Sequence, residues 1–403
     1  MAEQLTNEQQ AAVDSRGRSL LVSAAAGSGK TKVLVERLFS YVEREGANLD
    51  DFLIITYTRA AASELRGKIA RALTERMERD LGNEHLRRQM LRVYRADIKT
   101  VDAFCTALLR ENCHLLGEDA RGHTLRPDFR VLDENDAQAL RERVLARTLD
   151  DFYDRLTPGG ALLADTLGAG RDDSALEALV LELHAKLQAQ PYEDKWLDAQ
   201  RALWSEVPDR IEKTPYGRIL LDEVRRKARH WQRLMQTAAQ EMTQNDALNQ
   251  KYAPAFLDVS YQLEALTAKA DEGWDAARGV SIAFPRLAPV KDSDSGELKT
   301  RMKALWDGCK AAVKGFGELL NASSGEAAED LRTMTPAMLA LIDLTAEFSR
   351  RYNEEKRRRN AADFSDQEHE AIRLLIGEDG TPTELARTVS TRYREIMVDE
   401  YQD

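Results

Sequence analysis

The sequence predicts an α/β fold in which a parallel sheet is interrupted by a large all-helical insertion. Short apolar runs alternate with helical patterns over roughly the first hundred residues, an alternation typical of α/β proteins. Between residues 115 and 360 strand-like runs nearly vanish, and amphipathic helical patterns replace them. The last segment returns to the opening style. We therefore expect residues 1–114 and 361–403 to form one domain, interrupted by a helical insertion domain of residues 115–360.

Four short apolar runs are the candidate strands of this sheet. The first leads directly into a glycine-containing loop, and the last ends at a pair of carboxylates. Apolar residues at helical spacing follow the first two runs, which predicts the order strand, loop, helix at both places. The candidate strands are residues 19–22, 52–55, 98–101 and 395–398.

The distribution of tryptophan supports a separate core in the insertion. Large aromatic side chains dominate the energetics of hydrophobic cores, so a segment that gathers them is expected to have a core of its own. All five tryptophans lie between residues 115 and 360, namely Trp196, Trp204, Trp231, Trp274 and Trp306.

Composition narrows the functional classes. Hydrophobic residues make up 43% and charged residues 32% of the chain, a balance typical of soluble, helix-rich proteins. No apolar run approaches the roughly 18 residues of a membrane span, and the N-terminus lacks the features of a signal peptide. The sparse cysteines Cys105, Cys113 and Cys309 fit a reducing compartment, so a cytoplasmic location is expected. The net charge of −11 argues mildly against nucleic-acid binding, although it leaves room for a local basic groove.

Residues 24–31 form a candidate phosphate-binding loop. Backbone N–H groups around Gly27 and Gly29 can point at the β- and γ-phosphates of a nucleotide, Lys30 can neutralise them, and the Thr31 hydroxyl can ligate Mg²⁺. Ala24 replaces the usual first glycine and is small enough to leave the turn open. The alternative is a chance Gly-Ser-rich turn, and the strand and helix expected on either side disfavour it.

Asp399 and Glu400, at the end of the last candidate strand, are the expected partners of that loop. The Asp399 carboxylate can hold Mg²⁺, and Glu400 can accept a proton from an attacking water. Taken alone, such a string is common, and an exposed acidic strand end is the default interpretation. Together with Lys30 it predicts a site for ATP and Mg²⁺.

Several strings resemble the motifs of superfamily-one DNA helicases of the UvrD/Rep/RecB type. Residues 5–13 resemble the Q motif, in which Gln9 would read the adenine edge. Residues 56–65 resemble motif Ia, residues 100–105 resemble motif Ib, and residues 399–403 resemble motif II. Arg37 matches an arginine that approaches the base in this family.

The resemblance implies a P-loop NTPase (RecA-like) fold and an ATP-dependent DNA helicase of 3′-5′ polarity. The implied catalytic residues are Lys30, Asp399, Glu400 and Gln402, with Thr31 and Asp399 as the ligands of Mg²⁺. The implied nucleotide contacts are Gln9, Ala26, Gly27, Ser28, Gly29, Lys30, Thr31 and Arg37.

Finer features resemble the AddA group of helicase/nuclease proteins. Asp102 stands where many family members carry histidine, and residues 363–366 precede the last predicted helix. Residues 190–191 and 196–197 in the insertion are also similar. This resemblance implies a role in double-strand-break repair and recombination. The implied partners are single-stranded DNA, at a 3′ tail or duplex end, and an AddB-like protein, with no membrane.

Motifs Ia and Ib contain the predicted contacts to DNA. Hydroxyl groups can bond phosphates, and aromatic rings can stack on bases. The alternative is that the two aromatic residues belong to the core, which the residues alone would favour by about two to one. The predicted set is Thr56, Tyr57, Thr58, Arg59, Thr100 and Phe104, and Arg59 stands where the family more often has asparagine.

Two further features are expected to carry no chemistry. The basic run of residues 356–359 is interpreted as a solvated helix face rather than a DNA clamp. The six histidines show no metal-ligand spacing.

Helicases of this family close their site between two motor domains, and the second domain supplies arginines to the transferring phosphoryl group. The sequence stops at Asp403, directly after motif II. Loss of an arginine finger costs about 10³–10⁵ in rate, so we expect this N-terminal motor portion to be inactive as a helicase and a nuclease alone. The competing hypothesis is a non-catalytic DNA- or protein-interaction module with a vestigial nucleotide site. A P-loop ATPase outside the helicases is disfavoured by Gln9 and by motifs Ia and Ib.

Overall fold

A computed structural model describes residues 5–25, 27–118, 122–167, 174–290, 296–377 and 379–402. The described chain is mostly helical with a small parallel sheet, and it divides into two compact units. Unit 1 comprises Met1–Asp150, His184–Glu193 and Glu347–Asp403, and unit 2 comprises Asp151–Leu183 and Asp194–Ala346. Residues 115–150, 184–193 and 347–360, which the sequence assigns to the insertion domain, are thus grouped with the first and last segments.

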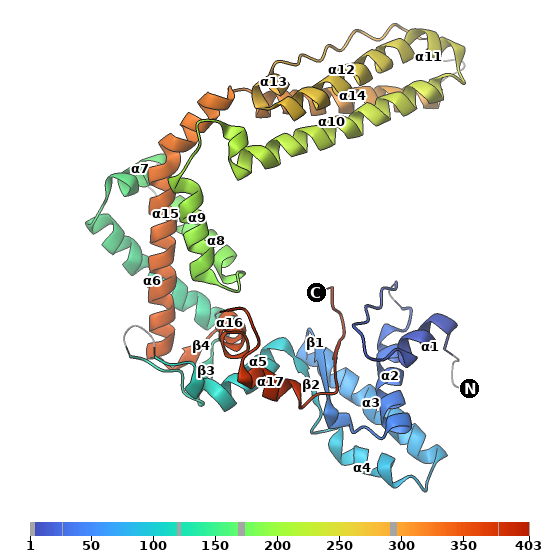
Figure 1. Cartoon of the computed structure of the whole chain (residues 1–403), viewed down its shortest axis with the longest axis vertical. Coiled ribbons are helices and arrows are strands. Elements are labelled where there is room, and N and C mark those ends of the chain that lie inside the picture. Colours follow the sequence, from blue (N-terminus) through green and yellow to red (C-terminus); the bar gives the residue numbers. More distant parts are fainter. Residues whose placement is uncertain are drawn as a thin grey trace. The chain divides into compact units, whose positions relative to one another are not determined.

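The sheet of unit 1 is parallel, with the strand order β2-β1-β5 (Figure 1). Its central strand is β1 (Phe52–Thr56), flanked by β2 (Asp97–Thr100) and β5 (Glu395–Val398). Leu53 lies opposite Asp97 on one side and Ile396 on the other. Every residue of β1 is buried, as expected for a central parallel strand covered on both faces. The first and last segments of the chain therefore share one sheet.

The first candidate strand, residues 19–22, is the prediction that fails. The structure assigns no strand to it and leaves Leu20, Leu21 and Val22 41%, 75% and 40% exposed. An apolar run becomes a strand only where a neighbouring backbone completes its hydrogen bonds. Among the residues that the structure describes, none pairs with this segment, and β5 forms the edge of the sheet.

Helices on both sides of the sheet complete unit 1. The first helices enclose a core with the strands, which includes Phe39, Phe52 and Ile69. A second core, with Leu109 and Leu374, lies between α5 and α16. The helices that lie wholly in unit 1 are α1 (Asn7–Asp14), α2 (Lys30–Glu45), η1 (Leu49–Asp51), α3 (Arg59–Arg79), α4 (Glu84–Arg92), α5 (Val101–Asn112), η2 (Cys113–Leu115), α16 (Phe364–Leu375) and α17 (Glu384–Ser390). A short parallel pair joins β3 (Arg130–Val131) to β4 (Ala361–Ala362).

Helices also carry the chain between the units. They are α6 (Glu134–Asp154), α8 (Ser174–Gln188), α9 (Glu193–Ser205) and α15 (Ser324–Arg358). No described helix is long and apolar enough to cross a membrane.

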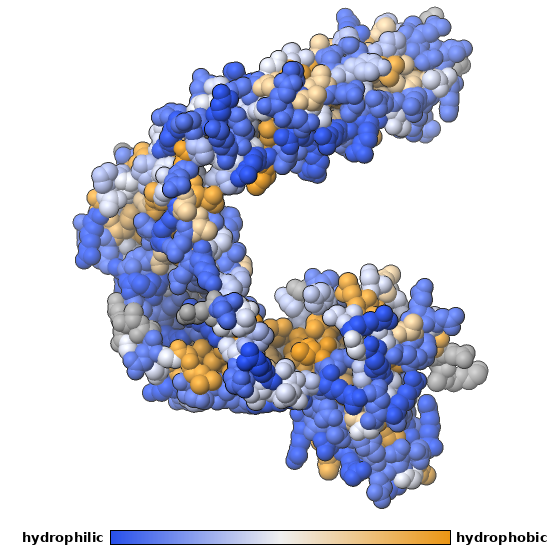
Figure 2. Space-filling model, in the orientation of Figure 1, coloured by the Kyte–Doolittle hydropathy of each residue, from blue (hydrophilic) through white to orange (hydrophobic). Residues whose placement is uncertain are grey.

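In its described residues unit 2 is helical and has its own core, as the tryptophans predict. Trp274 and Trp306 are buried in that core, and Trp231 packs against it with its ring over Gly308. A Cβ atom at Gly217 would lie 2.0 Å from the Ile211 carbonyl oxygen, so this turn requires glycine. The surface of these helices is largely hydrophilic (Figure 2). The remaining elements are α7 (Pro158–Leu167), η3 (Ile211–Lys213), α10 (Pro215–Met242), α11 (Asp246–Lys251), α12 (Ala253–Glu272), α13 (Trp274–Arg278) and α14 (Gly296–Leu319).

Candidate nucleotide and DNA site

The predicted phosphate loop leads into the N-terminus of α2. Gly27 and Gly29 have φ of 77° and 84°, in the left-handed region that favours glycine, and nothing lies within 4 Å of a Cβ built on Gly27. The Lys30 ammonium donates to the Ala24 carbonyl at 2.9 Å, which holds it against the loop. Because α2 begins at Lys30, its unpaired N–H groups face the same place, an arrangement suited to anions. Ala26 lies outside the described residues.

The Q-motif glutamine contacts this loop directly. Thr6 caps α1 in a reciprocal arrangement with Gln9, in which each side chain bonds the backbone of the other residue. The Gln9 amide Nε2 also donates to the Ser28 carbonyl oxygen at 3.0 Å. The predicted adenine reader is therefore held at the phosphate loop by its own side chain.

The two ends of the chain meet at Thr31 and Asp399. These residues are 368 apart in sequence, and the Thr31 hydroxyl donates to the Asp399 carboxylate at 3.3 Å. The Asp399 N–H donates to the Ile55 carbonyl at 2.9 Å, so pairing with β1 continues past the end of β5. A hydroxyl and a carboxylate beside a phosphate loop fit Mg²⁺, which takes one or two protein oxygens plus nucleotide phosphates. The described residues hold no cluster of three or more metal-ligating side chains that would suggest another metal.

Glu400 and Gln402 lie just beyond the strand. Glu400 is exposed and has φ of 56°, an uncommon conformation for a residue with a side chain. Its N–H donates to Asp399 Oδ1 at 3.2 Å, and the Gln402 amide donates to its carboxylate. The backbone turn and Gln402 together orient the carboxylate expected to act as the base.

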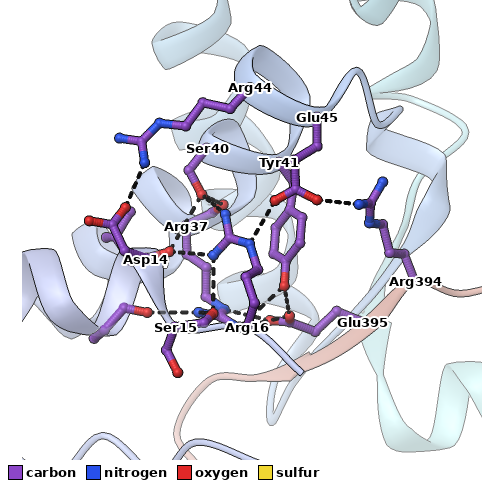
Figure 3. Close-up of polar contacts among 12 residues, drawn as sticks. Asp14, Ser15, Arg16, Arg37, Ser40, Tyr41, Arg44, Glu45, Arg394 and Glu395 are labelled. Atoms are coloured by element: carbon purple, nitrogen blue, oxygen red, sulfur yellow. Dashed lines mark hydrogen bonds and ion pairs between the residues drawn. The ribbon is translucent and has the colours of Figure 1, made fainter. Parts of the chain in front are cut away.

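Arg37 does not lie where a contact to the base would be made from solvent. Its side chain is 8% exposed and points toward β5, with Nε 2.5 Å from Glu395 Oε1 and Nη2 2.8 Å from Glu395 Oε2 (Figure 3). Nη1 donates to the carbonyls of Ala12 and Ser15 at 2.7 and 2.5 Å. Burial lowers the pKa of Arg37, but its bonds to Glu395 outweigh burial and raise the pKa overall. The guanidinium therefore stays charged and is bound on three sides by the protein.

The three threonines of the predicted DNA set stabilise local backbone structure. Thr58 caps α3 by accepting from the Ala61 N–H at 3.0 Å, and Thr100 caps α5 in the same way. The Thr56 hydroxyl donates to the Thr58 carbonyl at 3.1 Å. Because β1 and β2 are parallel, both capped helix N-termini lie at the same edge of the sheet. Thr58 is exposed there, whereas Thr56 and Thr100 are buried.

The aromatic residues of the set have different environments. Tyr57 is 66% exposed, so it is no core residue, whereas Phe104 is half-buried against the core between α5 and α16. Arg59 is exposed, and its charge acts on Asp102. Burial raises the pKa of Asp102, and Arg59 opposes that rise.

One exposed aromatic residue escaped residue-by-residue reasoning. Phe364 is 40% exposed at the start of α16, a helix that packs on α5. The signal for it was a large apolar residue directly after the helix-capping Asp363, outside the apolar pattern of the buried face.

The basic run of residues 356–359 corrects a prediction, because it is not a uniformly solvated face. Lys356 is 1% exposed, and its ammonium donates to Asp363 and Asp366 at 2.9 and 2.7 Å. Arg357 is paired with Glu370, while Arg358 and Arg359 pair with Glu355 at the surface. The error has a local cause, since Lys356 reaches two acids at the start of the next helix.

Comparison with known proteins gives a consistent picture. The family model of the UvrD/REP helicase N-terminal domain matches residues 5–403. The chain is similar to the ATP-dependent helicase/nuclease protein AddA of Acetivibrio thermocellus, with 31% identity over 99% of this chain and 32% of that protein. It is also similar to the proteins of the same name from Alkaliphilus oremlandii (34%, covering 99% and 33%) and Desulfitobacterium hafniense (35%, covering 99% and 29%). The chain thus spans about a third of the length of these relatives.

Proposed function

Because the chain belongs to the UvrD/REP helicase N-terminal domain family, we propose that it is the ATP- and DNA-binding motor portion of an AddA-like helicase/nuclease in DNA repair. The observation that carries this proposal is the contact between Thr31 and Asp399. It brings a hydroxyl from the start of the chain to a carboxylate from its end, beside a lysine and two left-handed glycines.

In this proposal each residue has a defined part. Lys30 and the N-terminus of α2 bind the phosphates of ATP, and Gln9 reads the adenine edge. Thr31 and Asp399 hold Mg²⁺, which neutralises phosphate charge when bound. Glu400 accepts the proton of the attacking water, and Gln402 orients Glu400 through their hydrogen bond.

The nucleotide part is tested by binding rather than turnover. Titration of the 403-residue chain with a fluorescent ATP analogue and Mg²⁺ should show saturable binding that Lys30→Ala weakens at least about tenfold, because the phosphates lose their charged partner. The matched control is Lys68→Ala, which removes an exposed lysine of α3 paired with Glu64. Absence of binding by the parent chain would instead favour the interaction-module hypothesis.

Single-stranded DNA is proposed to bind at the sheet edge where β1 and β2 end. The exposed ring of Tyr57 and the exposed Phe364 offer stacking surfaces, and Arg59 offers a charge. Base–aromatic stacking is worth about 1–3 kcal/mol per base, so Tyr57→Ala or Phe364→Ala should weaken oligothymidine binding at least about fivefold in fluorescence anisotropy. Tyr94→Ala, at an exposed tyrosine after α4, is the control expected to leave affinity unchanged.

The remaining proposals rest on the printed names of the relatives. Those names describe one component of an ATP-dependent helicase/nuclease, which supports an AddB-like partner, 3′-5′ polarity and a cytoplasmic location for the protein to which this chain belongs. Copurification with an AddB-like protein tests the partner. Unwinding of 3′-tailed against 5′-tailed duplexes by the resulting complex tests the polarity.

A further inference from the structure

We propose that Arg37 and Glu395 are positioning residues for the Mg²⁺-binding carboxylate Asp399. This inference rests on the proposed function, because it concerns how that nucleotide site is held together. Neither residue faces the phosphate loop. Both act through the two elements that carry Thr31 and Asp399 (Figure 3).

Helix α2 and strand β5 are joined at two points. The strand begins at Glu395 and leads to Asp399, while the helix carries Thr31 in its first turn and Arg37 less than two turns later. From Thr31 to Arg37 the helix rises about 9 Å, and from Glu395 to Asp399 the strand rises about 13 Å. The pair Thr31–Asp399 closes the end at the site, and the pair Arg37–Glu395 closes the other end.

The remote pair is built more strongly than the pair at the site. Arg37 grips both carboxylate oxygens of Glu395, and the Tyr41 hydroxyl donates to the same carboxylate. Bidentate, charge-assisted bonds fix both distance and orientation. The β5 backbone is held at the same end, because the Arg394 N–H donates to the Asp51 carbonyl at 2.7 Å. A shift of β5 along α2 would break these bonds before it moved Asp399.

The same guanidinium also anchors the helix that carries Gln9. Nη1 of Arg37 binds the carbonyls of Ala12 and Ser15 at the C-terminal end of α1, where a cation complements the helix dipole. The other end of α1 is tied to the phosphate loop through Gln9 and Ser28. One buried side chain thus supports both the proposed adenine reader and the proposed metal ligand.

Two substitutions separate positioning from general stability. Glu395→Gln keeps the shape of the side chain but removes the charge that Arg37 binds, and Arg37→Lys keeps the charge but removes the bidentate fork. Substitution of residues that orient a metal ligand typically lowers metal affinity roughly 10- to 100-fold, so both variants should weaken Mg²⁺-dependent ATP binding by that factor. Binding of ATP in EDTA should change less than about twofold, because the phosphate loop and Lys30 are untouched.

The experiment is a pair of ATP titrations of the 403-residue chain, one with Mg²⁺ and one with EDTA, for the parent and each variant. The control is Arg44→Gln, which breaks a more exposed ion pair with Asp14 in the same neighbourhood and should change neither titration. Equal losses in both titrations would mean a merely structural role, and no loss in either would exclude any role, so both outcomes overturn the inference. If the parent chain itself binds no Mg-ATP, or if Lys30→Ala binds as well as the parent, the proposed function fails instead.

Discussion

Unit 1 contains two buried cations that hold carboxylates, and they differ in what they connect. Arg37 joins three elements, α1, α2 and β5, and its partner Glu395 is 358 residues away in sequence. Lys356 joins two elements close together in the chain, since its partners Asp363 and Asp366 follow it by 7 and 10 residues at the start of α16. The same chemistry therefore serves long-range registration in one place and a local corner in the other.

The electrostatics of the two clusters differ in the same sense. One carboxylate receives Arg37, so charges there are balanced one to one. Two carboxylates receive Lys356, and both also accept backbone N–H bonds in the cap of α16. The charge of Lys356 lowers the pKa of Asp363 against the opposing effect of burial, whereas burial dominates for Asp366 and raises its pKa. We therefore expect the Lys356 cluster to matter mainly for stability, and the Arg37 cluster mainly for the nucleotide site.

The largest expected effect is the loss of Lys356. Lys356→Met would leave Asp363 and Asp366 facing each other in a buried site without a cation. Removing one partner of a buried ion pair costs about 3–5 kcal/mol of unfolding free energy, which chemical denaturation at neutral pH would measure. The control Arg358→Met, on the exposed side of the same helix, should cost about 1 kcal/mol or less. Equal costs for both variants would refute the assignment of Lys356 as a buried anchor.

A second, smaller effect concerns the histidine beside this cluster. His184 is buried against Phe348 and Tyr352, and burial, followed by the charge of Lys356, lowers its pKa to about 3. The folded state keeps the ring neutral where the unfolded state, with its usual pKa near 6.5, takes up a proton. The unfolded state thus binds more protons between about pH 6.5 and 3, and stability must fall as pH falls through that window.

The magnitude can be isolated with one variant. His184→Leu removes the titrating ring, so the difference in unfolding free energy between the parent and the variant should shift by about 2 kcal/mol between pH 7 and pH 5, against the parent. Other titrating groups are common to both proteins and cancel. A difference that does not change with pH would show that the ring is hydrated or charged in the folded state.

These two clusters also show what the sequence could and could not predict. The phosphate loop, β1, β2 and β5 were predictable because their signals are local, as glycine, lysine and apolar runs sit within a few residues of each other. The pairing of Asp399 with Thr31 followed from chemistry rather than from spacing. The burial of Arg37 and Lys356 was missed because it depends on where distant or following acids fold back.

The failed strand of residues 19–22 has the same explanation. Its apolar residues have the local pattern of a strand, but strand formation requires a neighbouring backbone that the pattern does not specify. Tyr57 and Phe104 make the complementary case, because both are aromatic residues in helicase-like motifs and only the fold separates the exposed ring from the half-buried one.

The smallest expected effect lies at the periphery of the Arg37 cluster. Arg44 and Asp14 form an ion pair at 2.6 Å, with 61% and 43% of their side chains exposed, and a bond from Gln10 together with Arg44 lowers the pKa of Asp14. Water screens such a pair and side-chain entropy opposes it, so Arg44→Gln should lower the unfolding free energy only slightly, well below the loss expected for Lys356→Met. Denaturation in low and high salt would measure this, since an exposed pair weakens with ionic strength while the buried Arg37–Glu395 pair is screened much less. A loss comparable to that of Glu395→Gln would mean that the cluster is one cooperative network rather than a buried support with a loose rim.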